Sequence, residues 1–357
     1  MPTLPAPRLR DLAFAIVRAM GSREEEAADV ADHLVGANLA GHDSHGVGMI
    51  PDYARLLQAG LLVPNQELRP LSDAGAVLLL DAGRGFGQRM AKEAMALAAE
   101  RARAQGAVVV ALRNSSHVGR IGAYGEQCAA MGLVSVHFVN VGDHAPHQAP
   151  YGCGEARLGT NPFCAALPDG AGGAAVVLDM ATTTIAFGKA RVARNKGVPV
   201  PPDAIIDGEG RPTTDPLPLV DRHEGALRSF GAHKGSGLAI LCEMLGGALT
   251  GGLTLQPENP REGGIVNSML SIVMDPAAFG EPALIAREVG AVGSWIKAAK
   301  PAAGFEEALL PGEPERRTRR LREAEGVPID DKSLADILAA GRSLGLAQAE
   351  LDRALGA

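Results

Sequence analysis

The sequence predicts a mixed α/β fold that is flanked by helices from both ends of the chain. Three observations support this class. The chain has 357 residues, 46% of them hydrophobic and 21% charged, which is typical of a globular enzyme with two or three lobes. Short apolar runs alternate with segments of helical period between residues 76 and 139. The segments at both ends, by contrast, have mostly helical patterns.

The N-terminal segment predicts two helices and a loop. The first helix carries an apolar stripe and ends at Gly21. Ser22 and Glu25 have the spacing of a capping box, so the second helix is expected to begin there, and Gly41 is expected to end it. Residues 42–48 then form a loop in which polar side chains can face a ligand.

The middle of the chain, residues 76–279, predicts the α/β part of the fold. Val77–Leu80 and Ala107–Leu112 have the pattern of buried strands, with a helix over Gln88–Gln105 between them, which is a βαβ arrangement. The further predicted elements are a helix over Gly119–Met131, a strand over Leu133–Val139, a glycine- and proline-rich stretch over Val141–Pro162, a strand over Val176–Leu178, a proline-rich connection over Val198–Leu219, a helix over Lys234–Leu249 and a strand over Ile265–Met274.

The C-terminal segment is predicted to be helical from about Pro282, most clearly over Asp331–Leu344. We therefore expect one helical lobe built from residues 1–75 together with 280–357. The α/β region over 76–279 is expected to bind cofactor and substrate. Such a lobe would bring the two termini together.

Charge and composition disfavour several classes of partner. The net charge is −7 and no long basic block is present, so neither nucleic acid nor an anionic membrane is expected to bind. The basic run over 316–320 is balanced by neighbouring glutamates. The sequence has no apolar signal segment and no run near 18 apolar residues, so we expect a cytoplasmic protein. Its four cysteines lack CxxC spacing, so we expect them to be reduced thiols.

Two histidines are candidates for proton transfer, because the ordinary pKa of histidine lies near neutrality. His45 follows Asp43 and Ser44, either of which could fix its tautomer. His117 lies between a predicted strand and a predicted helix, where α/β sheets present ligand-binding groups. A purely structural role remains open for each histidine on local grounds. His137, Asp143, His144 and His147 match no strong metal-ligand spacing, so no metal site is predicted.

The usual dinucleotide fingerprint is missing. No GxGxxG follows a strand and opens a helix, and the glycine-rich residues 170–175 lead into a strand instead. His233, Lys234 and Gly235 stand at the start of a predicted helix, where a cation and free backbone N–H groups suit a phosphate. A pyridoxal-phosphate lysine at Lys234 and an ordinary helix start are the alternatives.

Taken in order, the motifs resemble the malate/L-lactate dehydrogenase family, whose fold is of the L-sulfolactate dehydrogenase type and which includes ureidoglycolate and piperideine-2-carboxylate reductases. The resemblance covers nearly the whole chain. It is carried by Gly41–Val47, Asn114–His117, Gly159–Phe163, Asp179–Thr183, Phe187–Lys189, His233–Gly235 and Pro311–Glu313.

The resemblance implies a mixed-sheet NAD(P)-binding fold that is not a Rossmann fold, and an intertwined homodimer. It implies NAD as cofactor, with NADP as the alternative. His45 becomes the leading proton donor and acceptor, Ser44 its orienting partner, and His117 the second acid/base candidate. The implied cofactor-binding residues are His45, Gly119, Arg120, Ile121, Asp179, Met180, Ala181, Thr182, Thr183, Lys189, His233, Lys234, Asn267, Gly312, Glu313, Pro314 and Glu315.

One departure concerns the substrate. Many family members carry an arginine four residues after the motif histidine, where this chain has Met49, although Tyr53 is kept. We hypothesise that Arg120 replaces the missing carboxylate anchor, so that Arg120, Tyr53 and Met49 bind substrate. Met49 would make the pocket more apolar and favour bulkier 2-oxo acids such as aryl pyruvates; oxaloacetate and 2-oxoglutarate are further candidate substrates.

The expected reaction is reversible hydride transfer between a nicotinamide cofactor and a 2-oxo or 2-hydroxy carboxylic acid. Reduction of a cyclic imine such as piperideine-2-carboxylate is the alternative within this class. A pyridoxal-phosphate enzyme that uses Lys234 and a non-catalytic ligand-binding relative are alternatives from other classes.

Overall fold

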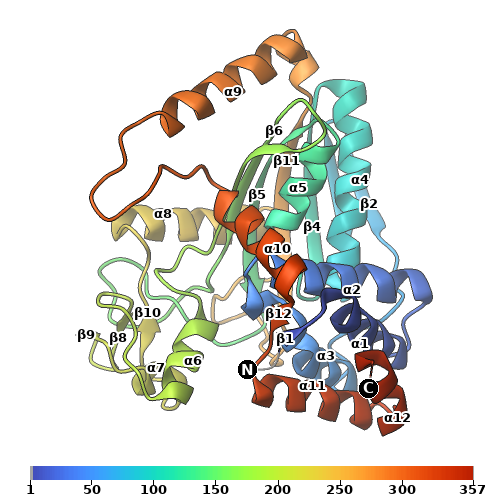
Figure 1. Ribbon diagram of the computed structural model, residues 1–357, viewed down its shortest axis with the longest axis vertical. Coiled ribbons are helices and arrows are strands. Elements are labelled where there is room, and N and C mark those ends of the chain that lie inside the picture. The colour runs from blue at the N-terminus through green and yellow to red at the C-terminus, as the bar shows by residue number, and fades with distance from the viewer. Residues whose placement is uncertain (1–2, 357) are drawn as a thin grey trace.

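The computed structural model describes residues 3–356, with all side chains in that range except those of residues 195 and 196. Its centre is a seven-stranded mixed sheet with the strand order β2-β3-β4-β11-β5-β6-β7 (Figure 1). The strands are β2 (Arg69–Asp73), β3 (Val77–Asp81), β4 (Ala107–Ser115), β5 (Val134–Gly142), β6 (Phe163–Pro168), β7 (Ala174–Met180) and β11 (Val266–Met274). Within this sheet only β3 and β4 pair in parallel, and α4 (Gly87–Gln105) connects them, which confirms the predicted βαβ unit.

Helices cover both faces of the sheet. On one face, α4 and α5 (Gly122–Ala130) pack against alternate strand residues such as Leu112, Val139 and Met269, and together they form one hydrophobic core. On the other face lies η3 (Cys242–Ala248), the π-helical continuation of α8 (His233–Leu241), which packs against β5 and β11. A Cβ atom on Gly246 would lie 2.7 Å from the carbonyl oxygen of Phe138, so this close approach requires glycine.

A second core is helical and combines both ends of the chain. It contains α1 (Ala6–Ala19), α2 (Glu24–Leu39), α3 (Ile50–Gln58), α11 (Asp331–Ser343) and α12 (Gln348–Leu355). The short strands β1 (Thr3–Leu4) and β12 (Val327–Pro328) pair beside it, and Figure 1 shows both termini at this end of the molecule.

The predicted capping box at the start of α2 is wrong. The helix begins at Glu24 with Arg23 as its N-cap, and no side chain caps it. Ser22 instead donates a hydrogen bond of 2.7 Å to Glu26, whose buried carboxylate also accepts from the backbone of Asn65. Tertiary contacts of Glu26 therefore take the hydroxyl that the local pattern assigned to the cap.

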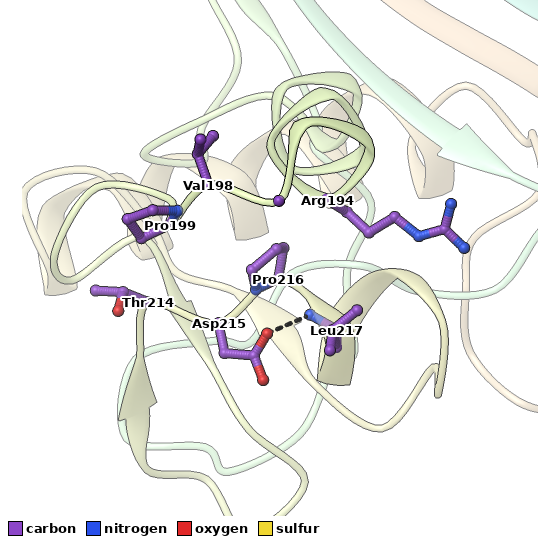
Figure 2. A pocket seen from close by; sticks show the side chains of 8 residues that line it. Arg194, Val198, Pro199, Thr214, Asp215, Pro216 and Leu217 are labelled. Carbon is purple, nitrogen blue, oxygen red and sulfur yellow. Dashed lines mark hydrogen bonds between the residues drawn. The ribbon is translucent and has the colours of Figure 1, made fainter.

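The proline-rich connection and the residues after it form a small three-stranded sheet that the sequence did not predict. It consists of β8 (Ile205–Ile206), β9 (Pro212–Thr213) and β10 (Ala226–Leu227), accompanied by α6 (Phe187–Lys196) and α7 (Leu217–Val220). A cavity of about 360 Å³ lies between the C-terminal end of α6 and the residues before α7. Figure 2 shows the side chains that line it. None of the predicted catalytic residues lines this cavity.

The remaining elements are the 3-10 turns η1 (Asp43–His45), η2 (Val47–Met49) and η4 (Pro276–Ala278), and the helices α9 (Pro282–Lys297) and α10 (Glu313–Glu325). In Figure 1, α9 extends away from the rest of the molecule, whereas α10 crosses in front of the sheet toward α2. Within residues 3–356, no helix is both long enough and apolar enough to cross a membrane.

Candidate active site

The loop that carries His45 is held by Asn38 at the end of α2. The Asn38 amide accepts a hydrogen bond of 2.9 Å from the backbone of Val47 and donates one of 2.7 Å to Asp43. The loop requires glycine at position 46, because a Cβ atom there would lie 2.1 Å from the side-chain carbonyl oxygen of Asn38. The loop is therefore fixed by hydrogen bonds to a helix rather than left flexible.

Ser44, and not Asp43, is the partner of His45. The Ser44 hydroxyl lies 3.0 Å from Nδ1 of His45. The carboxylate of Asp43 turns instead to Asn38 and to the guanidinium of Arg322 on α10. Of the two groups that the sequence offered for orienting His45, the structure selects the hydroxyl.

His117, just after β4, lies against His45. Their rings are stacked, with centroids 5.7 Å apart and planes 18° apart. Nδ1 of His117 is 2.7 Å from the hydroxyl of Tyr53 on α3. The Tyr53 side chain is buried, with 1% of its surface exposed, and its hydroxyl is engaged, so the structure supports contact with His117 rather than with substrate.

Two polar residues of this cluster were missed in the sequence analysis. Gln88, in the first turn of α4, donates a hydrogen bond of 2.5 Å to the Tyr53 hydroxyl. His33 on α2 accepts one of 2.9 Å from the backbone N–H of Arg120. Each is an isolated polar residue in a helical pattern, so only the tertiary structure reveals its partners.

Arg120 is occupied by carboxylates. Its guanidinium makes two hydrogen bonds, of 3.0 and 2.7 Å, to Glu126, and its Nε lies 3.3 Å from Asp179 at the end of β7. Only 2% of the side chain is exposed. This placement does not support the hypothesis that Arg120 anchors a substrate carboxylate, because its guanidinium is already paired with two carboxylates.

Burial keeps the histidines of the cluster neutral. It lowers the pKa of His45 to about 4, although the carboxylate of Asp179 raises that pKa, while His42 and Arg120 lower it further. Burial also lowers the pKa of His117 well below its usual value, and the nearby His45 and His33 act in the same direction. A neutral imidazole can accept a proton from a substrate hydroxyl, which is the behaviour of a general base.

Several of the implied cofactor residues lie around this histidine pair. Gly119 and Ile121 flank Arg120 at the start of α5, and Asn267 on β11 accepts a hydrogen bond of 2.9 Å from the backbone of Val118. On α10, Glu315 lies 3.4 Å from His42. Gly312, with a φ of +91°, opens α10 beside Val177, whose N–H donates to the carbonyl of Pro311.

The segment after β7 continues the same region. Met180 and Ala181 are half-buried, and the Thr182 hydroxyl lies within hydrogen-bond distance of two acceptors, the Thr160 carbonyl at 2.9 Å and the Gln148 side chain at 3.1 Å. The Thr183 hydroxyl is buried without a hydrogen-bond partner among the described residues. Lys189 lies on α6, one residue after Gly188, where an added Cβ atom would lie 3.2 Å from the Cβ of Ser44.

Other implied residues lie elsewhere or have structural partners. His233 and Lys234 are exposed at the start of α8, and the His233 ring lies 5.8 Å from that of Tyr151. Glu313 and Pro314 begin α10, and Glu313 forms an ion pair with Lys297. Met49 is half-buried and packs against the helical core.

The histidines considered for a metal are dispersed. His137 is buried within β5 between the hydroxyls of Ser135 and Ser271, whereas His144 stacks on His147. Among the described side chains, no group of three or more histidine, cysteine, aspartate or glutamate residues is arranged to hold a metal ion.

Comparison with known proteins identifies the family of the chain. The profile of the malate/L-lactate dehydrogenase family matches residues 4–338. Hydroxycarboxylate dehydrogenase B of Escherichia coli is 47% identical over 348 residues, which are 97% of this chain and 95% of that protein. The sulfolactate dehydrogenase of Methanocaldococcus jannaschii superimposes with a TM-score of 0.86 at 33% identity, over 97% of this chain and 98% of that one.

A third similar structure is the delta1-piperideine-2-carboxylate reductase of Pseudomonas syringae, with a TM-score of 0.81 and 29% identity, over 95% of this chain and 100% of that one. The match of the family profile to nearly the whole chain and the 47% identity to a full-length relative both exceed what a shared fold alone would give. The chain therefore belongs to the malate/L-lactate dehydrogenase family and is an oxidoreductase.

Proposed function

We propose that the protein catalyses the reversible oxidation of 2-hydroxycarboxylic acids to 2-oxo acids with NAD. The observation that carries this proposal is the stacked pair of neutral histidines, His45 and His117, 5.7 Å apart in a chain of this family. Each ring has a hydroxyl partner on Nδ1, so each has its Nε2 available for substrate.

The residues around this pair fit a nicotinamide cofactor. The unpaired Thr183 hydroxyl offers a buried polar contact among the described residues, and the carboxylate of Glu315 can accept hydrogen bonds from ribose hydroxyls. When bound, the nicotinamide would accept a hydride from carbon 2 of the hydroxy acid during oxidation and donate one to carbon 2 of the oxo acid during reduction. The residues that would hold it are His45, Gly119–Ile121, Asp179–Thr183, Lys189, Asn267 and Gly312–Glu315, whereas His233 and Lys234, exposed at the start of α8, are cofactor contacts only by the resemblance.

Proton transfer falls to His45. With the Ser44 hydroxyl accepting from Nδ1–H, the Nε2 of His45 is unprotonated and takes the proton of the substrate hydroxyl during oxidation. In the reverse direction the same nitrogen returns the proton to the new alkoxide. The carboxylate of Asp179 raises the pKa of His45 and so favours the protonated intermediate.

We further propose that the preferred substrates have one carboxylate and an apolar side chain. By the resemblance, many family members carry arginine where this chain has Met49, and the Arg120 guanidinium is already paired with Glu126 and Asp179. The site therefore offers little free positive charge for the second carboxylate of malate or 2-oxoglutarate. Aryl pyruvates and their 2-hydroxy acids suit this arrangement better.

Cyclic imine reduction is the second candidate, favoured by the similarity to the piperideine-2-carboxylate reductase. It differs only in that a ring nitrogen, rather than an oxygen, exchanges the proton. The pyridoxal-phosphate hypothesis has no support, because Lys234 is exposed and the chain belongs to the malate/L-lactate dehydrogenase family.

One assay separates these candidates. Purified protein is offered phenylpyruvate, oxaloacetate, 2-oxoglutarate and piperideine-2-carboxylate, each with NADH and with NADPH, and the absorbance of the reduced nicotinamide is followed. We expect the fastest oxidation of NADH with phenylpyruvate, and a loss of about a hundredfold or more in His45→Ala. Turnover of the imine alone, or full activity in His45→Ala, would refute the proposal.

We also propose a homodimer and a cytoplasmic location. Apolar side chains of α9 are exposed on the single chain, which supports association with a second copy. All four cysteines are free thiols, as is usual in a reducing compartment.

A further inference from the structure

We propose that Gln88 and Tyr53 are positioning residues that hold His117 in the tautomer with its proton on Nε2. This inference rests on the proposed function for its catalytic meaning, although its structural part can be tested without substrate. It assigns different tasks to the two histidines: His45 exchanges the proton, and His117 donates a hydrogen bond to the reacting oxygen.

The direction of the hydrogen bonds follows from a count of protons. The Tyr53 hydroxyl has a single proton, and it accepts a hydrogen bond from the Gln88 amide at 2.5 Å. Its proton is then directed to Nδ1 of His117 at 2.7 Å, so that nitrogen must be unprotonated. Because burial keeps His117 neutral, its one proton stays on Nε2.

Burial makes this chain of hydrogen bonds decisive. Gln88 and Tyr53 each have only 1% of their surface exposed, so water does not compete for the bonds between them. Burial also raises the pKa of Tyr53, which keeps its hydroxyl protonated. Tyr53 is the hydrogen-bond partner of the Gln88 NH2 group, whereas the Gln88 carbonyl oxygen has no hydrogen-bond partner among the described residues.

The backbone holds Gln88 and His117, the two ends of this series of hydrogen bonds, close together. A Cβ atom on Gly87 would lie 2.3 Å from the carbonyl oxygen of Ser116 and 2.5 Å from that of His117. The first turn of α4 is thus packed directly against the segment that carries His117. This close packing places the Gln88 side chain beside Tyr53 and leaves it little freedom to move away.

The two histidines are then complementary. In the proposed reaction the Ser44 hydroxyl accepts from Nδ1–H of His45, which leaves Nε2 of His45 unprotonated, whereas His117 offers an Nε2–H. A substrate oxygen between them can give its proton to His45 while it accepts a hydrogen bond from His117, which stabilises the negative charge that develops on this oxygen.

The test is nitrogen-15 NMR of the full-length protein, without substrate, after its histidines have been labelled with nitrogen-15. The signals of His117 are assigned by their absence from the spectrum of His117→Gln. We expect Nε2 of His117 to be protonated in the wild type. In Gln88→Glu, an ionised carboxylate would accept the Tyr53 proton, Tyr53 would accept from His117, and the proton would move to Nδ1. A protonated carboxyl group at position 88 donates as the amide does, so the change should develop as pH rises.

The kinetic expectation is that kcat of Gln88→Glu falls by about tenfold or more over the same pH range, with little change in the KM of the nicotinamide. The titratable groups that face these hydrogen bonds are His33 and His45 beside His117, and Asp52 near Tyr53. They are unchanged in the variant, so a pH effect absent from the wild type arises at position 88.

Phe86→Leu is the matched control, because the Phe86 ring packs edge-on against Tyr53 at 5.9 Å without a hydrogen bond. It should leave the His117 tautomer unchanged.

If Gln88→Glu does not fold, Tyr53→Phe replaces it and should give His117 in mixed tautomers with a lower kcat. A proton on Nδ1 in the wild type, a tautomer insensitive to these variants, or a tautomer change without loss of kcat would overturn the proposal. The predicted tautomer in a protein that oxidises no hydroxy acid would refute the proposed function instead.

Discussion

His45 and His117 are both held neutral by burial, although neutral pH lies near the ordinary pKa of histidine. Their different partners nevertheless give them different chemistry: a serine hydroxyl orients one ring, and a buried tyrosine orients the other. The sequence motifs predicted both histidines and Ser44, because these residues lie in loops next to predicted elements. Gln88 and His33 could not be predicted, since an isolated polar residue in a helix shows its role only through partners that are distant in sequence.

The lowered pKa of His45 predicts the pH dependence of hydroxy acid oxidation. Oxidation requires the neutral ring, and this form exists above the pKa of about 4. The kcat/KM for the hydroxy acid should therefore rise with pH up to about 4 to 5 and stay level to about pH 7. His223→Gln, at an exposed position, should leave the profile unchanged. A midpoint near about 6.5 would contradict the assignment, because it would indicate an ordinary exposed histidine.

Met49→Arg tests the origin of substrate preference. A guanidinium four residues after His45 would supply the free positive charge that Arg120, paired with Glu126, does not. We expect kcat/KM to rise about tenfold for malate relative to phenyllactate, which corresponds to about one charge-assisted hydrogen bond. Met244→Arg, at a 57% exposed position on η3, is the control and should not change the ratio. Equal changes for both substrates would show that position 49 does not select between them.

At the scale of elements, the strongly periodic segments were predicted and the strands that depend on pairing were not. The β3-α4-β4 unit was visible because apolar runs and a helical period alternate there. β2 contains Pro70 and is exposed along its length, as an edge strand can be, so its sequence resembles a loop. β6 is short and ends at Pro168, and its identity as a strand comes from pairing with β5 and β7.

The end of α2 controls the shape of the His45 loop, and two glycines of this region should respond differently to alanine. In Gly46→Ala the new methyl group collides with the Asn38 amide, which holds both Val47 and Asp43. We expect a loss of about 2 kcal/mol in the free energy of unfolding, and lower activity. Gly36→Ala, within α2, meets no atom within 4 Å and should raise that free energy by about 0.5 kcal/mol. Urea denaturation measures both, and a tolerated Gly46→Ala would contradict the role of Asn38.

For the whole molecule, α9 is notable because it contributes no residue to either of the two cores. None of the described side chains of α9 is buried, and Figure 1 shows the helix extending from the body. Its large apolar side chains, and those of the segment that follows, are exposed to water: Leu284, Val292, Trp295, Ile296, Phe305 and Leu309. Such a surface is costly on a monomer and is typical of an interface between subunits.

We therefore expect Trp295→Glu to convert a dimer into a monomer. Trp295 is 78% exposed on the single chain, so its replacement removes an apolar contact of about 2–3 kcal/mol and places a charge in the interface without disturbing either core. Light scattering coupled to size-exclusion chromatography gives the mass directly. Arg287→Glu, an exposed charge on the same helix, is the control for a change of charge alone and should remain dimeric. A wild-type monomer at all concentrations, or a dimeric Trp295→Glu, would show that α9 is not the contact between subunits.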